Sequence, residues 1–104
     1  MVWPSLDGVP ACANKRLLTD ILRRQWNFTG YVVSDDDALE LIIVGHHYVR
    51  DDVSAAAAAL SAGCNLELTD SGPVFHSIPQ VGPVTCSHCL LWFGPALMVC
   101  AGVY

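Results

Sequence analysis

Three consecutive aspartates are the residues of this sequence best suited to do chemistry. Asp35, Asp36 and Asp37 directly follow the apolar run Tyr31–Ser34. In parallel α/β folds, reactive side chains gather at the carboxyl ends of the strands, on the loops that lead into helices. If Tyr31–Ser34 is a strand, Asp35 occupies that place.

A second set of carboxylates, Glu67 and Asp70, lies around the next apolar segment. A retaining glycosidase needs two carboxylates about 5–5.5 Å apart, one to attack the anomeric carbon and one to donate and then remove a proton. Asp35 and Asp36 cannot share that work on a strand, because adjacent side chains point to opposite faces. The alternative is that these aspartates cap the following helix, which alone would account for Asp36 and Asp37.

The elements that would position these carboxylates alternate as helix, strand, helix and strand. Asn14 is a plausible N-cap for a helix over about residues 15–26. The apolar side chains of that segment follow a 3.6-residue period; they are Leu17, Leu18, Ile21, Leu22 and Trp26. Because Tyr31–Ser34 is apolar up to its last residue, we expect a strand buried on both faces, as in a parallel sheet covered by helices.

A helix-like apolar stretch follows the aspartates, and an alanine-rich helix comes next. Asp51 or Asp52 can cap the alanine-rich helix, Gly63 suits its C′ position, and 64–68 is predicted as the next strand. Short connections in this order predict right-handed crossovers and a parallel sheet. Since a closed (β/α)8 barrel takes about 250 residues, we expect this chain of 104 residues to be a slice of something larger.

Composition and charge exclude several classes of function. The chain has 5 basic and 10 acidic residues, a net charge of −5, and therefore no basic surface for nucleic acid or an anionic membrane. All charged residues lie between Asp7 and Asp70, so residues 71–104 carry none. The apolar run Cys89–Tyr104 is shorter than the roughly 20 residues of a membrane-spanning helix and is interrupted by Gly94–Pro95, so we expect no membrane anchor there.

The sequence predicts no metal, cofactor or disulfide framework. The five cysteines have no secreted-type spacing, and Cys86–Cys89 is a single C-x-x-C where structural zinc needs four ligands. His46 and His47 are adjacent and so point in different directions on a helix, which is a poor arrangement for a metal. Met1–Ser5 lacks the basic and apolar regions of a signal peptide, and the localisation stays unknown.

Several segments together resemble a known enzyme family. They are Asp7–Asn14, Leu17–Arg23, Trp26–Phe28, Gly30–Asp35, Ala55–Ala59, Ala62–Leu68 and Ile78–Gln80. The chain resembles glycoside hydrolase family 3, in its β-xylosidase-like subgroup. The resemblance implies that residues 1–80 are a fragment of the N-terminal (β/α)8 TIM barrel, from about the sixth-to-eighth strand region. Residues 81–104 are expected to be a non-family apolar tail of irregular structure, added by alternative splicing, intron read-through or an erroneous gene model.

The resemblance also implies a reaction. Asp35 corresponds to the family's catalytic nucleophile in retaining hydrolysis of a terminal β-linked sugar, with xylose favoured and glucose or arabinose as alternatives. The substrate would be a β-linked oligosaccharide or glycoside, and no cofactor is implied. Glu67 corresponds to the end of the eighth strand and not to the family's general acid/base, which has no counterpart here. Asp36 stands where the subgroup often has Cys or Gly.

We expect the isolated chain to be inactive, because the family's other sugar-binding groups have no counterpart in this sequence. The competing interpretation is a non-catalytic interaction or regulatory fragment with an exposed apolar surface. The family is often secreted, but the absence of a signal peptide leaves the compartment open.

Overall fold

A short antiparallel hairpin begins the part of the chain that the computed structural model describes, residues 5–81. Strand β1 (Ser5–Leu6) pairs with β2 (Val9–Pro10) through an Asp7–Gly8 turn. Both turn residues have positive φ, 52° for Asp7 and 79° for Gly8, which is the conformation that Asp-Gly favours in a two-residue hairpin.

The first long helix follows a 3-10 turn, η1 (Ala11–Ala13), and has wide, π-type winding. This helix, η2, spans Arg16–Gln25, and the Trp26 N–H donates to the Ile21 carbonyl five residues back at 2.9 Å. Asn14 Oδ1 accepts from the Leu17 N–H at 3.0 Å, so the predicted capping role of Asn14 is confirmed. The prediction that Trp26 belongs to the apolar face of this helix was wrong, because Trp26 lies beyond the helix and is 70% exposed.

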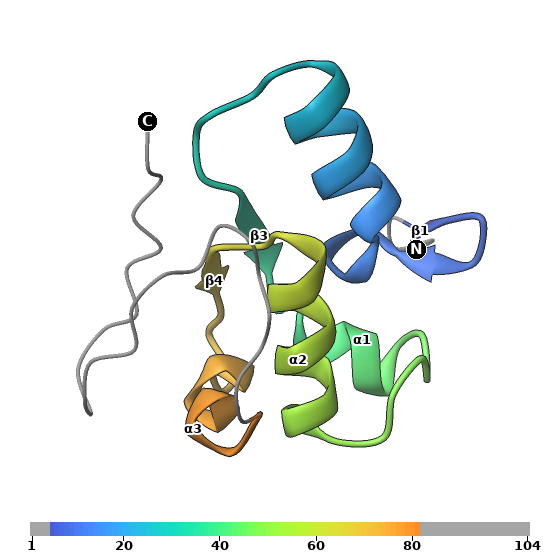
Figure 1. Cartoon of the computed structure of the whole chain (residues 1–104). Coiled ribbons are helices and arrows are strands. Elements are labelled where there is room, and N and C mark those ends of the chain that lie inside the picture. The colour runs from blue at the N-terminus through green and yellow to red at the C-terminus, as the bar shows by residue number, and fades with distance from the viewer. Residues whose placement is uncertain (1–4, 82–104) are drawn as a thin grey trace.

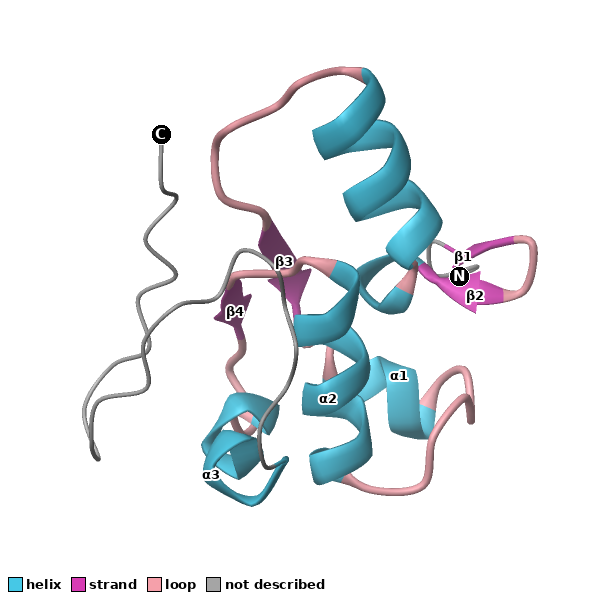
Figure 2. Ribbon diagram, viewed as in Figure 1, coloured by secondary structure: helices cyan, strands magenta, loops and turns pink. Residues whose placement is uncertain are grey.

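Two parallel strands carry the aspartates and the second set of carboxylates. Strand β3 spans Val33–Asp36 and β4 spans Leu66–Leu68, and they lie side by side in Figure 2. Val33 pairs with Leu66 and Asp36 with Leu68, with an irregularity in the register between these pairs. The predicted parallel pair is confirmed, but β3 begins two residues later than expected and includes the first two aspartates.

One face of this strand pair is uncovered, which corrects the expectation of burial on both faces. We call Val33, Leu66 and Leu68 the open face; they are 42%, 45% and 54% exposed. They share one side because Val33 pairs with Leu66, and alternate residues of a strand point the same way. The apolar run predicted burial on both faces, yet within residues 5–81 only the opposite side is packed, where Ser34 is buried.

The helices build the core. Helix α1 spans Glu40–Val44 and α2 spans Asp52–Ala62, while η3 (Val74–Ser77) leads into α3 (Ile78–Val81). In Figure 1, α2 is central, with α1 beside it, and it contacts α1, α3 and η1. The small alanine side chains of α2 let neighbouring elements pack closely against it. The buried apolar residues of this helical core are Leu18, Leu39, Ile42, Ala55, Ala56, Ala59, Leu60, Ala62, Cys64 and Val74.

Both ends of α2 are fixed as the sequence predicted. Asp51 is its N-cap, since its Oδ1 accepts from the Ser54 N–H at 2.8 Å. Gly63 ends it with φ of 107°, a conformation that favours glycine, and donates to the Ala59 and Leu60 carbonyls. The order of helix, strand, helix and strand agrees with an α/β fold. The predictions for the apolar run Cys89–Tyr104 fall outside the described residues.

Candidate active site

Asp35 lies where the sequence predicted, at the carboxyl end of β3. Its side chain is exposed, while the preceding Ser34 is only 3% exposed. Ser34 Oγ accepts from the Leu68 N–H at 3.0 Å, which ties the end of β3 to β4. Asp35 Oδ1 accepts from the Asp36 N–H at 2.9 Å, leaving the other carboxylate oxygen free of a hydrogen bond within the described residues. An exposed, unburied carboxylate of this kind can act as a nucleophile toward a bound electrophile.

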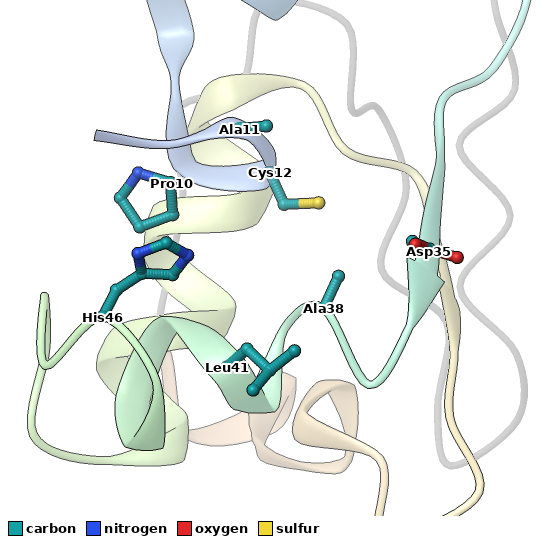
Figure 3. Close-up of a pocket in the computed structure, with 7 residues that line it drawn as sticks. All are labelled: Pro10, Ala11, Cys12, Asp35, Ala38, Leu41 and His46. Carbon is teal, nitrogen blue, oxygen red and sulfur yellow. The ribbon is translucent and has the colours of Figure 1, made fainter. Parts of the chain in front are cut away.

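A small hollow adjoins Asp35. Figure 3 shows Asp35 on one side of it, and Pro10 and His46 together on the other, with Cys12 between. The remaining lining residues are Ala11, Ala38 and Leu41. The cavity volume is about 20 Å³, room for one water molecule, whereas pockets for small ligands take about 300–1,000 Å³. The hollow on its own is therefore too small to enclose a sugar ring.

Asp37 joins the loops that follow the two strands. Its Oδ1 accepts from Thr69 Oγ1 at 2.7 Å and Ser71 Oγ at 2.9 Å, with the Asp70 and Ser71 N–H groups also directed at it. The hydroxyl of Thr69, and then that of Ser71, lowers the pKa of Asp37 by stabilising the carboxylate. Ser71 Oγ also lies within hydrogen-bond reach of Glu40, to which its one hydroxyl proton can be donated in place of Asp37, so the same cluster reaches the start of α1.

The structure thus corrects the helix-capping alternative for Asp36 and Asp37. Helix α1 has Leu39 at its N-cap position and no side-chain cap there. Asp37 has a positive φ of 54° and turns toward the end of β4 instead. Asp36 is the last residue of β3 and is exposed. No local pattern predicts this link, because a polar Thr-Asp-Ser segment after a strand is typical of an ordinary turn.

Asp36 lies in an unfavourable environment for a second negative charge. Partial loss of solvent around its carboxylate raises the pKa of Asp36, and neighbouring acids raise it further. These acids are Asp70, Asp37 and Asp35. The ends of β3 and β4 therefore form one acidic edge, in which Asp37 is stabilised by hydroxyl donors and Asp36 is not.

Glu67 has a structural role. Its two carboxylate oxygens accept from the Val74 and Phe75 N–H groups, each at 2.8 Å, and so hold the start of η3. This agrees with the expectation that Glu67 is not the general acid/base. Asp70, the other carboxylate considered beside β4, donates its backbone N–H to Asp37 and is exposed.

Cys12 is the neighbour of Asp35 that the sequence did not reveal. The two residues line the same hollow, although 23 residues separate them. No motif links their positions, so only the folding of η1 onto α2 could reveal that Cys12 lies at the site.

Metal sites and membrane spans were also sought in residues 5–81. No group of three or more His, Cys, Asp or Glu side chains there could hold a metal ion. His46 lines the hollow, and His47 is an exposed residue with φ of 50°. No helix within the described part of the chain has the length and apolar character to cross a membrane. The Cys86–Cys89 pair lies beyond those residues.

Comparison with known proteins gives a family from the sequence and glycosidase relatives from both sequence and structure. The family model described as "Glycosyl hydrolase family 3 N terminal domain" matches residues 1–82. An exo-1,4-beta-xylosidase of Emericella nidulans is 47% identical over 68 residues, 62% of this chain and 9% of that protein. Beta-D-xylosidase 1 of Arabidopsis thaliana is 38% identical over 71 residues, 68% of this chain and 9% of that protein.

A solved structure, that of a β-glucosidase from Erythrobacter marinus, aligns with a TM-score of 0.67 at 44% identity. It covers 72% of this chain, which in turn covers 10% of that protein. The chain thus spans about a tenth of the length of the relatives that it matches. The family match includes β3, Asp35 and β4, the elements that build the acidic edge. This chain belongs to glycosyl hydrolase family 3 and matches that family's N-terminal domain.

Proposed function

We propose that this chain carries the nucleophile of a retaining β-glycosidase and that Asp35 is that nucleophile. The observation that carries the proposal is the exposure of Asp35 at the carboxyl end of a parallel strand, in a chain of a glycosyl hydrolase family. Ser34 and Asp37 on either side are both engaged with the β4 region. Asp35 has instead only the hydrogen bond from Asp36, so its carboxylate is available to a substrate.

The reaction has two steps with balanced bonds and charges. A carboxylate oxygen of Asp35 attacks the anomeric carbon, and the bond to the leaving oxygen breaks as a general acid protonates that oxygen. The resulting glycosyl ester on Asp35 is then hydrolysed by water, whose proton passes to the same acid/base group. Two inversions at the anomeric carbon leave its configuration unchanged, which is the retaining outcome.

The general acid/base belongs to another part of a longer protein. Glu67 is engaged at the start of η3, and the hollow beside Asp35 cannot enclose a sugar. The chain also corresponds to about a tenth of its relatives. The isolated chain is therefore expected to turn over no glycoside, although it supplies the attacking group.

The substrate class follows from the named relatives. We propose a β-linked xyloside at the non-reducing end, since two of the curated relatives are described as xylosidases. A glucoside is the second choice, because the aligned solved structure is described as a β-glucosidase. Arabinose remains a third alternative.

We further propose the place of this chain in the family's fold. The β3–β4 pair would be the seventh and eighth strands of a (β/α)8 barrel, and the open face would point toward strands that this chain does not contain. Residues 1–80 would be the family-derived part and residues 81–104 a separate apolar tail. Sequencing the transcript across the codons for Gln80 and Val81 tests the tail; a continuous message with conventional splicing contradicts it.

The role of Asp35 is tested by transplanting residues 5–81 into the matching segment of the Emericella nidulans exo-1,4-beta-xylosidase. The chimera should cleave a chromogenic β-xyloside, and a 2-fluoro-xyloside with a good leaving group should form a stable ester on Asp35. Asp35→Ala should abolish turnover, and azide should restore it by forming a xylosyl azide of inverted configuration.

Asp36→Asn is the matched control because it changes an adjacent exposed carboxylate. It should keep the chimera active. Labelling of another carboxylate, or full activity of Asp35→Ala, contradicts the assignment. Hydrolysis of the chromogenic xyloside by the isolated chain would contradict only the expectation that this chain is inactive. It would leave the assignment of Asp35 unchanged.

The second candidate function is a non-catalytic interaction fragment, which the open face favours. Apolar side chains at Val33, Leu66 and Leu68 are about half exposed. A well-folded chain that binds one specific protein partner, and loses it on Leu66→Asp and Leu68→Asp substitution, would support that function over the catalytic one.

A further inference from the structure

Asn27 begins a triplet, Asn27-Phe28-Thr29, with the pattern that N-linked glycosylation requires. In that pattern an Asn is followed two residues later by Ser or Thr, and the residue between them is not Pro. The chain has two other asparagines, Asn14 and Asn65, and neither has Ser or Thr two residues later. Asn27 is therefore the one asparagine of the sequence that an oligosaccharyltransferase can select.

The fold also separates the three asparagines by what their side chains contact. Asn14 is 7% exposed, and its side-chain oxygen accepts from the Leu17 N–H at 3.0 Å. Asn65 is half-buried, and its side-chain oxygen accepts from the Arg23 guanidinium at 2.6 Å. Asn27 is exposed, and in the described part of the chain its side chain takes no part in a hydrogen bond. Its amide nitrogen is thus free to react, whereas Asn14 and Asn65 hold the fold together.

The loop between η2 and β3 presents the triplet to solvent. This loop has neither helix nor strand, and residues 26–31 are all exposed. Asn27 has a positive φ of 54°, a conformation that Asn adopts more readily than most residues. The Phe28 N–H donates to the Leu22 carbonyl at 3.1 Å, which holds the loop backbone to η2. The backbone beside Asn27 is therefore anchored while its side chain stays in solvent.

The triplet lies away from the acidic edge. The loop enters β3 at its amino end, whereas Asp35 lies at the carboxyl end of the same strand. Figure 1 shows this loop at the opposite end of β3 from α1, the helix that follows the aspartates. A glycan on Asn27 would therefore leave the surroundings of Asp35 uncovered.

Exposed aromatic side chains flank the acceptor. Trp26 and Tyr31 are 70% and 67% exposed, and Phe28 within the triplet is 42% exposed. Large apolar side chains gathered on a surface promote association between copies of a protein. A bulky and hydrophilic oligosaccharide joined among them would shield this apolar surface.

We propose that Asn27 is an acceptor site for an N-linked oligosaccharide, transferred from a polyprenyl diphosphate carrier. The side-chain nitrogen of Asn27 attacks C1 of the first sugar, and the bond between C1 and the diphosphate oxygen breaks. The lipid diphosphate leaves, and the nitrogen loses one proton as the new C–N bond forms. Thr29 supplies the hydroxyl by which the transferase selects the acceptor. The site is filled where the chain meets this transferase, in the lumen of the secretory route.

The test delivers the full chain into microsomes behind a leader peptide that is cleaved on entry. The chain should gain the mass of one glycan, and peptide-N-glycosidase should remove that mass and convert Asn27 to an aspartate. The glycan should be found on the tryptic peptide 25–50, because the chain has no Lys or Arg between Arg24 and Arg50. A chain that enters the microsomes, as leader cleavage shows, and gains no glycan would overturn the proposal.

Matched variants of the triplet test its chemistry. Asn27→Gln removes the acceptor, and Thr29→Val removes the hydroxyl while keeping the shape of the side chain, so neither variant should gain a glycan. Thr29→Ser restores a hydroxyl and should regain it. A glycan that persists in Thr29→Val would contradict selection through this triplet.

Arg16→Thr tests whether exposure selects the site, because it places a Thr two residues after the buried Asn14. Arg16 itself is exposed, so the change leaves the core intact. The purified, folded variant should take one glycan, at Asn27, from solubilised oligosaccharyltransferase and a dolichyl diphosphate oligosaccharide. Two glycans would overturn the role of exposure. None of these measurements uses hydrolysis of a glycoside, so their failure is separate from any failure of Asp35 to act as a nucleophile.

Discussion

The helical core around α2 and the open face of the β3–β4 pair both consist of apolar residues, but they differ in how far other residues shield them from solvent. Ile42 and Leu39 are fully buried, while Leu66 and Leu68 are 45% and 54% exposed. The helices of this chain cover each other and one side of the strand pair, and nothing within residues 5–81 covers the other side. Asp35 thus lies at the end of a strand pair that the described residues pack on one side only, beside a hollow that is too small for a sugar ring.

The largest expected change in the free energy of unfolding comes from truncating one side chain in each region. Ile42→Ala should lower the free energy of unfolding by about 2–5 kcal/mol, because it leaves a cavity among fully buried neighbours. Leu68→Ala should change it by less than about 0.5 kcal/mol, since a half-exposed side chain loses little packing. Urea unfolding followed by circular dichroism measures both.

Equal losses in the two variants would mean that the open face is covered in solution, by another copy or by other residues. Light scattering at the same protein concentrations distinguishes these cases, because an association of copies depends on concentration and an intramolecular cover does not.

The sequence predicted the core better than the site, for a physical reason. Asn14, Asp51 and Gly63 act through hydrogen bonds to residues within four positions, so local pattern was sufficient. Asp37 acts on Thr69 and Ser71, and its partners depend on how two strands pair. Whether the open face is buried depends on which residues pack against it, and no local pattern in the sequence describes that packing. The expectation that Val33 is buried was wrong for this reason.

Asn65 joins the two regions and should give the next largest effect. Its Oδ1 accepts from the Arg23 guanidinium at 2.6 Å and from the Val32 N–H at 2.8 Å, linking η2 to the strand pair. Asn65→Ala leaves both donors without this acceptor and should cost about 1–3 kcal/mol.

Asn65→Asp is the matched variant, because it keeps an oxygen acceptor and places a negative charge next to Arg23. Its loss of stability should be smaller than that of Asn65→Ala in the same urea titration. Equal losses in both would show that the Arg23–Asn65–Val32 link does not stabilise the chain.

Loss of the α2 cap should come next. Asp51→Ala removes the acceptor of the Ser54 N–H and should cost about 0.5–2 kcal/mol, while Asp51→Asn should retain most of the stability. Asp51 is exposed and does not line the hollow, so neither change should alter the reactivity of Cys12 toward iodoacetamide. A changed rate would mean that the cap also controls the hollow beside Asp35.

The smallest and most specific test compares two neighbours at the acidic edge, Asp36 and Asp37. Hydroxyl donors lower the pKa of Asp37, so its charge stabilises the fold above the usual aspartate pKa of about 3.9, and that contribution is lost as the pH falls through the lowered value. Asp37→Asn should therefore lower the urea midpoint at pH 7, and the difference from the unchanged chain should shrink in acid.

Asp36 should respond with the opposite sign. Its pKa is raised by partial desolvation and then by the nearby acids, so the fold loses stability as the pH rises through that raised value. Asp36→Asn should raise the urea midpoint at pH 7 and have no effect below a pH of about 3.9, where the group is neutral in both states. Added salt should reduce the gain, because it screens the repulsion among exposed carboxylates. A lower midpoint for both variants at pH 7 would show that the edge needs the two charges together, and that Asp36 has a partner outside residues 5–81.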